Sequence, residues 1–491
     1  MDAFGNAALD QGGLTGDQNS TGTAMAIWTG AMHGRGGSTI WVFERDRDDA
    51  KRRNYEAQLV TLRPDVIYKV GKATLDLNRL TYEVAALNNQ PAEVGMLYSN
   101  TSRVFNLGHM NAASETYFAL DHNGVKLHII NDLIPGSIKD LKMVVLPEVT
   151  HLKQDMLDAL RDYIANGGHV VIVGDENSIR YSRFGMENDP DEVAYIKNNS
   201  TIIPAHLDGI TMDSPAQEDL RKALADELQK VGMDRITIVD SKTGERVTDT
   251  DYWATTYEGD LLVQAMYMYH WDEPIEAKLL INGKPAGEIK ELVTGKTYQE
   301  TFPLVTGEPV VLRVDTNNPF IDTYGHWAEK EIVSLADQKT VSGMSETMFA
   351  PDRTITRAEF TALIVRMLGL EKSQNNAFSD VKASDWFAGE ANAAAAAGLL
   401  AVSKEFSGNG VIGRGEMAYM LKKACEQKGK LKGEQKSFAD ISESTAFAAE
   451  ISAAGGMGLI SGYEDGLFHP ERSLTRAEAV MVLSKLAEAL K

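Results

Sequence analysis

The chain has 491 residues, so at roughly 150 residues per domain it holds three or four folded units. Its formal net charge is −21, from 70 acidic and 49 basic residues, which argues against a nucleic-acid surface because phosphate binding needs clustered Lys and Arg. Its apolar runs fall short of the roughly 20 residues that cross a bilayer, so no membrane span is expected. Because Cys425 is the only cysteine, neither an internal disulfide nor a cysteine-based zinc cluster can form.

Residues 1–62 contain one predicted helix, a glycine-rich turn and a short strand. The helix covers residues 24–32, the turn 33–37 and the strand 38–43. The start of the chain lacks the basic segment and the apolar core of a secretory signal. These elements look like the end of a larger domain. We therefore expect their apolar residues, such as Trp28, to be loosely packed, since most of their partners would be missing.

Two further domains are predicted between residue 63 and residue 316. Residues 63–245 alternate apolar, strand-like runs with amphipathic stretches, which indicates a parallel sheet covered on both faces. Residues 246–316 change to short alternating strands, and Asn282-Gly283 predicts a tight hairpin in a small antiparallel β domain. The strand candidates of the α/β domain are residues 93–98, 125–130, 143–146 and 169–173, with a helix at 152–165.

The last third of the chain repeats one pattern three times, with a period of about 60 residues. Each repeat starts with Phe-x-Asp and later reaches an Arg-x-Glu block, after which apolar residues at i, i+3, i+4 and i+7 predict a helix. An earlier helix precedes each block. Since no repeat buries its apolar face alone, we expect a threefold bundle of helix–loop–helix units. The repeats span residues 317–372, 373–432 and 433–491, and their blocks are Thr356-Arg357-Ala358-Glu359, Gly413-Arg414-Gly415-Glu416 and Thr475-Arg476-Ala477-Glu478.

Thr-x-x-Glu is a capping box that closes the start of a helix. The arginine after the threonine sits in the first turn, where the helix dipole disfavours a positive charge by some tenths of a kcal/mol. An incoming carboxylate would explain this placement, because it would gain the helix N–H groups and a bidentate guanidinium together. In the alternative interpretation, the arginine is a solvated surface residue paired with a nearby carboxylate. The second repeat lacks the threonine, because Gly413 replaces it, which puts the groove of that repeat in question.

These repeats resemble S-layer homology domains. The resemblance is carried by the Phe-x-Asp starts, the tryptophans that open two of the first helices, the Ser-Gly pairs, the Phe-x-Pro loops and the Thr-Arg-Ala-Glu blocks. It implies a pseudo-threefold prism whose grooves bind a secondary cell-wall polymer on peptidoglycan, commonly one that carries a pyruvylated sugar. It also implies an extracellular location at the cell wall or S-layer. The residues expected to bind the polysaccharide are Asp322, Trp327, Ser342, Gly343, Arg357 and Glu359 in the first repeat, Asp380, Trp386 and Arg414 in the second, and Asp440, Ser461, Gly462, Arg476 and Glu478 in the third.

The upstream half resembles the rear portion of β-galactosidase-type glycoside hydrolases. The resemblance is carried by Ala31-Met32-His33-Gly34, by residues 40–43 and by residues 72–80. It implies that residues 1–62 are the end of a TIM barrel and that residues 63–245 are a flavodoxin-like trimerisation domain, similar to glutamine amidotransferases. Residues 246–316 would be the small β domain that follows. A homotrimer is the oligomer that this resemblance implies.

We expect no catalytic residue, cofactor or metal site in this chain. A complete barrel takes about 250 residues, and retaining glycosidases need two carboxylates about 5 Å apart on different strands. The resemblance places both catalytic glutamates on strands that are absent here. The expected function is a cell-surface anchor that carries a non-catalytic glycosidase region; the alternative is an active wall-attached β-galactosidase-like hydrolase, or a fragment of one. Weaker candidates are Glu44, Asp46 and Asp48 as a remote catalytic group, Ser178 as a nucleophile, and residues 189–192 as a calcium loop.

Overall fold

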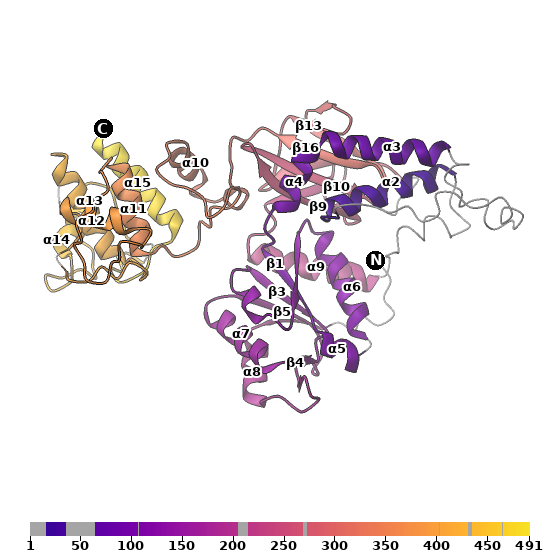
Figure 1. The fold of residues 1–491 in the computed structure, drawn as a ribbon, viewed down its shortest axis with the longest axis horizontal. Coiled ribbons are helices and arrows are strands. Elements are labelled where there is room, and N and C mark those ends of the chain that lie inside the picture. The colour runs from indigo at the N-terminus through magenta and orange to yellow at the C-terminus, as the bar shows by residue number, and fades with distance from the viewer. Residues whose placement is uncertain are drawn as a thin grey trace, which may run out of the picture. The chain divides into compact units, whose positions relative to one another are not determined.

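The computed structural model describes residues 16–35, 64–106, 108–204, 215–268, 273–401, 403–430, 435–463 and 465–491. The chain divides into two compact units, Met1–Thr316 (the upstream unit) and Asn317–Lys491 (the repeat unit), which Figure 1 colours from indigo to yellow along the chain. The strand expected at residues 38–43 and the candidates Glu44, Asp46 and Asp48 lie outside the described residues. Among the helices that the structure describes, none is both long enough and apolar enough for a membrane span.

A five-stranded parallel sheet forms the centre of the α/β part, which confirms the predicted parallel sheet. Its strand order is β2-β1-β3-β5-β7, and every neighbouring pair is parallel. Strands of such a sheet are buried on both faces and are therefore apolar almost throughout. The strands are β1 (Val94–Tyr98), β2 (Leu127–Asn131), β3 (Met143–Pro147), β5 (His169–Gly174) and β7 (Thr201–Pro204), and a separate pair is formed by β4 (His151–Leu152) and β6 (Tyr181–Ser182).

Helices cover both faces of this sheet. Successive residues of a strand point to opposite faces, so Val144 joins one apolar core and Val145 joins the other. The first core is closed by α7 (Gln154–Ala165) and α8 (Pro190–Asn198), and the second by α6 (Gly108–Asp121) and α9 (Pro215–Lys230). Two short elements complete this part, α5 (Asn100–Phe105) and η4 (Pro135–Ile138).

Two antiparallel sheets follow. One has the order β14-β13-β16-β10-β9, and the other has β12-β11-β15 with β8 paired to β11. The predicted hairpin joins β11 to β12, and Asn282 and Gly283 have φ of 48° and 73°, as a tight hairpin turn requires. The strands are β8 (Ile236–Asp240), β9 (Thr250–Tyr257), β10 (Asp260–Tyr267), β11 (Ile275–Ile281), β12 (Lys284–Pro285), β13 (Ile289–Glu291), β14 (Thr297–Tyr298), β15 (Thr301–Leu304) and β16 (Pro309–Val314).

Strand β8 differs from the sequence-based expectation. It lies within residues 63–245, which were assigned to the α/β domain, yet it pairs with β11 of the antiparallel part. The antiparallel part therefore begins before residue 246. The sequence of β8 predicts a strand but not its pairing partner, because that partner lies about 40 residues further along the chain.

Three helices pack on the antiparallel part: α2 (Gly16–Met32), α3 (Pro64–Arg79) and α4 (Thr81–Asn89). The side chain of Trp28 is only 2% exposed and shares a core with Trp253 and Leu262. The expectation of loose packing is therefore wrong for the described part of α2. Its partners come from the β strands and from α3 and α4.

The repeat unit contains two α-helices per repeat, as predicted. The first helices are α10 (Glu329–Asp337), α12 (Ala388–Ala396) and α14 (Ala448–Gly456), and the second are α11 (Arg357–Met367), α13 (Arg414–Gln427) and α15 (Arg476–Leu490). Each first helix packs on the second helix of the preceding repeat, so that α12 lies on α11, α14 on α13 and α10 on α15. One continuous apolar core runs through all three repeats. The repeats are therefore interlocked in a ring.

A closed ring of backbone hydrogen bonds lies where the three repeats meet. The N–H of Ile355 donates to Leu474 (3.0 Å), that of Leu474 to Ile412 (3.4 Å) and that of Ile412 to Ile355 (3.3 Å). All three side chains are fully buried. Each residue lies just before the helix that carries its repeat's arginine, so the ring fixes the starts of α11, α13 and α15 around a pseudo-threefold axis.

Candidate functional site

The Phe-x-Asp aspartate of each repeat holds a loop of its own repeat. The Oδ1 and Oδ2 of Asp322 accept the backbone N–H groups of Phe349 (2.8 Å) and Ala350 (2.6 Å). Asp380 and Asp440 do the same in their repeats. The loop needs this support, because its second residue is left-handed, with φ of 59° at Ala350, which costs a non-glycine residue roughly 1 kcal/mol or more. These aspartates therefore shape the site.

The arginine of each block crosses to the loop of the next repeat in the ring. Arg476 donates through Nε to the carbonyl of Phe349 (3.0 Å) and through Nη2 to that of Ser342 (2.9 Å). Arg414 makes the same pair of bonds to Phe468 (2.9 Å) and Ser461 (2.7 Å). Each loop is thus held by its own aspartate through N–H groups and by a neighbouring arginine through carbonyls.

This arrangement groups the sequence-predicted residues across repeats. The arginine of a repeat lies with the aspartate and the Ser-Gly pair of the next repeat, and not with those of its own. The three groups are Arg476 with Asp322, Ser342 and Gly343; Arg357 with Asp380; and Arg414 with Asp440, Ser461 and Gly462.

The helix N-termini are already satisfied by neighbouring repeats. On α11, the N–H of Arg357 donates to Gly410 (2.8 Å) and that of Ala358 to Gly408 (2.9 Å), while the N–H of Glu359 donates to Thr356 Oγ1 (3.2 Å). The starts of α13 and α15 make the equivalent bonds to carbonyls of the third and first repeats. The expectation that a ligand carboxylate takes these helix N–H groups is therefore wrong, because the threefold packing uses them.

Two of the three helices start with the predicted capping box. Thr356 with Glu359 and Thr475 with Glu478 form it completely. On α13, Gly413 provides no side-chain cap, and the carboxylate of Glu416 instead accepts the Nε–H of Arg357 at 2.7 and 3.0 Å. Arg357 is thus paired with a carboxylate of this chain, as the alternative interpretation expects, although its side chain is only 22% exposed.

We call each arginine, together with the loop of the next repeat that it contacts, a groove. The groove of Arg414 differs from that of Arg357, because two guanidiniums share one aromatic ring. The Cζ atoms of Arg414 and Arg472 lie 4.5 and 4.4 Å from the ring centre of Tyr463. Among the described residues, no carboxylate lies within 4 Å of either guanidinium. Burial lowers the pKa of Arg414, and the nearby Tyr463 and Glu478 offset this only in part. Arg414 therefore has no salt bridge to a described carboxylate, and Glu478, which acts on it from further away, is bonded to Tyr463 and Thr475.

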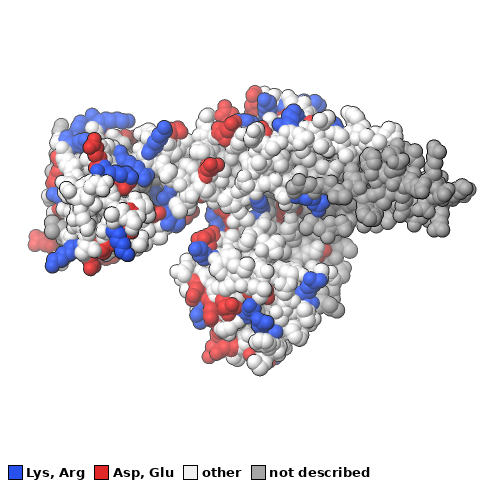
Figure 2. All heavy atoms as spheres, in the orientation of Figure 1, with Lys and Arg blue, Asp and Glu red and all other residues white. Residues whose placement is uncertain are grey.

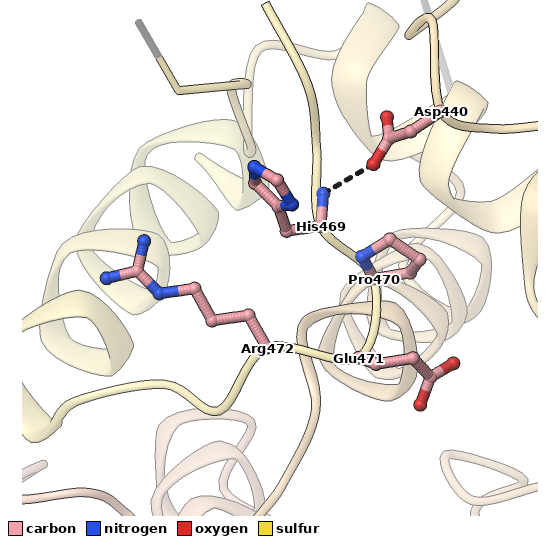
Figure 3. A pocket seen from close by; sticks show the side chains of 5 residues that line it. All are labelled: Asp440, His469, Pro470, Glu471 and Arg472. Atoms are coloured by element: carbon pink, nitrogen blue, oxygen red, sulfur yellow. Dashed lines mark hydrogen bonds between the residues drawn. The ribbon is translucent and has the colours of Figure 1, made fainter. Parts of the chain in front are cut away.

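A cavity of about 460 Å³ lies beside this pair, lined by Asp440, His469, Pro470, Glu471 and Arg472. Figure 3 shows Glu471 turned away from Arg472, and Asp440 bonded to the backbone of His469. The cavity is thus formed by the third repeat at the loop that Arg414 contacts. The second repeat contributes its arginine to an intact neighbour, although its own loop is altered.

The groove that receives Arg476 resembles this one. Arg476 is 7% exposed, its Cζ lies 4.4 Å from the ring centre of Phe349, and burial lowers its pKa to about 10. No described carboxylate lies within 4 Å of it, whereas the nearby Arg353 is paired with Glu359. Gly343 is required here, because a Cβ at this position would lie 2.3 Å from the carbonyl oxygen of Ser345.

The predicted tryptophans are strongly exposed. Trp327 and Trp386 expose 58% and 56% of their surface, which is unusual for so large an apolar side chain in a soluble protein. In the third repeat, Phe447 is half-buried against Tyr419 at a ring separation of 5.4 Å. Two repeats therefore present an indole to solvent and the third does not.

Sequence analysis missed Tyr463 and Arg472. A signal for the arginine was present, since Arg353 and Arg472 both stand two residues after the proline of the Phe-x-Pro loop. The second repeat has Gly410 at the equivalent position. Figure 2 shows Lys and Arg side chains gathered on the visible face of the repeat unit, although the whole chain is acidic.

The weaker upstream candidates have structural roles. Ser178 is 1% exposed, and no hydrogen bond joins it to a histidine within the described residues. The carboxylate of Asp189 accepts the N–H groups of Asp191 and Glu192, so residues 189–192 form the capped start of α8.

The family model of the S-layer homology domain matches residues 319–361, 377–418 and 437–480, which confirms the predicted class of the three repeats. Within that class, the chain is 37% identical over 175 residues to the exoglucanase XynX of Acetivibrio thermocellus, across 34% of this chain and 16% of that protein. It is 31% identical over 170 residues to the surface-layer 125 kDa protein of Lysinibacillus sphaericus, across 33% of this chain and 14% of that protein. The chain therefore spans a small part of the length of each relative.

Among solved structures, the chain is similar to the apo exo-carrageenase GH42 from Bacteroides ovatus. The TM-score is 0.48 and the identity 17%, over 60% of this chain and 39% of that one.

Proposed function

We propose that the repeat unit attaches this protein non-covalently to a secondary cell-wall polysaccharide at the cell surface, by binding carboxylate groups on its sugars. Pyruvylated sugars supply such carboxylates. The observation that carries the proposal is that Arg414 and Arg472 both lie close to the ring of Tyr463 without a described carboxylate within 4 Å, and that Arg472 lines a cavity.

A carboxylate is the ligand that this pair favours most. Hydrogen bonds between a guanidinium and a carboxylate are charge-assisted and contribute about 1.5–3 kcal/mol each. The Nε and Nη2 atoms of Arg414 are held by backbone carbonyls. They fix the guanidinium in place, so little side-chain entropy is lost when a ligand binds. The exposed indoles Trp327 and Trp386 offer apolar surface to sugar rings in the other repeats.

The three grooves differ in their capacity to bind. The groove of Arg414 has two unpaired guanidiniums and is the principal site. The groove of Arg476 has one unpaired guanidinium and is the second site. The groove of Arg357 is closed to anions, because Glu416 occupies the guanidinium where a ligand carboxylate would lie.

Binding to purified wall material tests this proposal. The full chain should sediment with peptidoglycan sacculi that carry the polymer, and mild acid removal of ketal-linked pyruvate from the polymer should abolish most of the binding. Sacculi stripped of the polymer are the control. Unchanged binding to the ketal-free polymer would remove the carboxylate from the proposal.

We propose in addition that the upstream unit of this chain is non-catalytic. The support is that a barrel capable of holding two opposed carboxylates needs far more chain than residues 1–62. We expect no turnover of a nitrophenyl galactoside by this chain. Measurable turnover that survives purification to homogeneity would favour the alternative, a wall-attached hydrolase.

The upstream unit is also proposed to form a homotrimer. Exposed apolar side chains follow strands β1 and β2, whose carboxyl ends lie along one edge of the parallel sheet, and others follow β6. Large apolar side chains left exposed in this way are typical of an interface with another chain, here a second copy. Analytical ultracentrifugation tests the trimer, and a monomer at micromolar concentration would contradict it. The residues are Val104, Phe105, Leu133, Ile134, Phe184 and Met186.

A further inference from the structure

In the upstream unit, three potential metal ligands meet that are far apart in the sequence. His33 follows α2, Asp121 ends α6 and Asp251 lies in β9. One ligand atom from each of them lies within 4.8 Å of the other two. The three residues therefore connect the first described helix to the α/β part and to the antiparallel part.

Asp121 is the member of this cluster that the rest of the chain leaves unexplained. It is 4% exposed, and its carboxylate makes no hydrogen bond to any residue that the structure describes. Asp251 is also buried, so two carboxylates lie close together away from water. Burial of a carboxylate without a hydrogen bond or a cation costs several kcal/mol. A divalent cation would neutralise both carboxylates at once.

The surrounding hydrogen bonds are those of oriented metal ligands. Asp251 Oδ1 accepts the amide of Gln264 (3.1 Å), while Oδ2 faces His33 Nε2 at 2.9 Å. On the other side of the imidazole, Nδ1 lies 3.3 Å from the hydroxyl of Tyr117. Metal-binding histidines commonly use their second ring nitrogen in such a bond, and ligating carboxylates are themselves hydrogen-bonded.

We propose that His33, Asp121 and Asp251 bind one divalent transition-metal ion of the zinc class. One imidazole nitrogen and two carboxylate oxygens are ligands that Zn²⁺ accepts, and a water completes four-coordination. His33 keeps 29% of its side chain exposed, so the ion has a route from solvent. The bound ion fastens the end of α2 to α6 and to β9.

Zinc titration of the full chain, freed of metal by a chelator, tests the proposal. Calorimetry should show one saturable Zn²⁺ site per chain, and Co²⁺ should give visible absorption of a low-coordinate site. The variant Asp121→Asn should lose both signals, because it removes one ligand while leaving the contact between His33 and Asp251 in place. His33→Gln should lose them as well. Glu227→Gln is the matched control, since it alters another histidine–carboxylate pair, with His169 at 2.7 Å.

Hydrogen exchange supplies a second readout. Zinc should slow exchange of the backbone N–H groups near the end of α2 by about tenfold or more in the original chain and leave the exchange of Asp121→Asn unchanged. The proposal is overturned by the absence of a saturable site, or by equal binding to the original chain and to both ligand variants.

Discussion

The grooves of Arg357 and Arg414 are built from the same parts, yet only Arg357 is paired with a described carboxylate. Both arginines begin a helix and cross to the loop of the next repeat. Arg357 meets Glu416, whose helix lacks the capping box, whereas Arg414 meets a repeat whose Glu478 is engaged in its own box. Two repeats therefore determine each groove, and a repeat with an altered loop still contributes its arginine to an intact neighbour.

The largest effect is expected from Arg472→Ala in the open groove. This side chain stacks on Tyr463 and takes no part in the hydrogen bonds by which Arg414 holds the carbonyls of Phe468 and Ser461. Its removal should weaken binding to the wall polymer about 10- to 100-fold, the equivalent of about 1.5–3 kcal/mol. The measurement is a binding isotherm on sacculi. Arg183→Ala, which removes another arginine stacked on a ring, is the control and should leave binding unchanged.

Arg357→Ala in the closed groove should lower stability and leave wall binding almost unchanged. It leaves Glu416 without its partner and frees the carbonyls of Phe406 and Ser407. We expect a loss of about 1–2 kcal/mol in the free energy of unfolding, measured by urea denaturation of the repeat unit. Wall binding should stay within twofold. A large loss of binding with unchanged stability would show that this groove takes part in attachment.

Glu416→Gln should open the closed groove. The amide keeps the size of the side chain but removes the charge that neutralises Arg357. Wall binding should strengthen about threefold, or about 0.7 kcal/mol, because a third guanidinium becomes available to the polymer. The same substitution at Glu426, which is paired with Lys422 on the same helix, serves as the comparison and should give no gain. Weaker binding by Glu416→Gln would contradict the closed state.

Acid should have the smallest effect, and it should act on the loops of the second and third repeats. The N–H groups of Phe406 and Ser407 hold the pKa of Asp380 below its usual range; for Asp440, burial raises the pKa but the N–H groups of Phe468 and His469 outweigh it. A carboxylate with a lowered pKa stabilises the fold above its unfolded pKa and loses this as the pH falls through its folded pKa.

Stability should therefore decline below about pH 4, near the ordinary pKa of aspartate. The urea midpoint of the repeat unit at decreasing pH measures this, and Asp380→Asn should flatten the decline. A midpoint that rises on acidification would show that other groups control the acid response.

Much of the repeat unit could be predicted from the sequence, because its signals are local. The period, the helix starts and the capping boxes of Thr356 and Thr475 follow from spacing within about ten residues. The grouping of residues into grooves could not be predicted. It depends on which repeat follows which around the ring, since the structure places Arg476 of the third repeat at Ser342 of the first.

In the upstream unit, too, local features could be predicted from the sequence and long-range contacts could not. The parallel sheet followed from its alternating runs, but the partner of β8 and the packing of Trp28 depend on strands and helices distant in the chain. The cluster of His33, Asp121 and Asp251 had no spacing pattern, since its members come from three separate elements.

The closed ring of Ile355, Leu474 and Ile412 has a mechanical consequence. A pull on the tethered protein enters the repeat unit at Asn317, next to the first repeat. That repeat is stapled to the last one through Arg476 and through the contact of α10 with α15. Force is thus transmitted directly from the first repeat to the last. We therefore expect the three repeats to unfold together under force and not one after another.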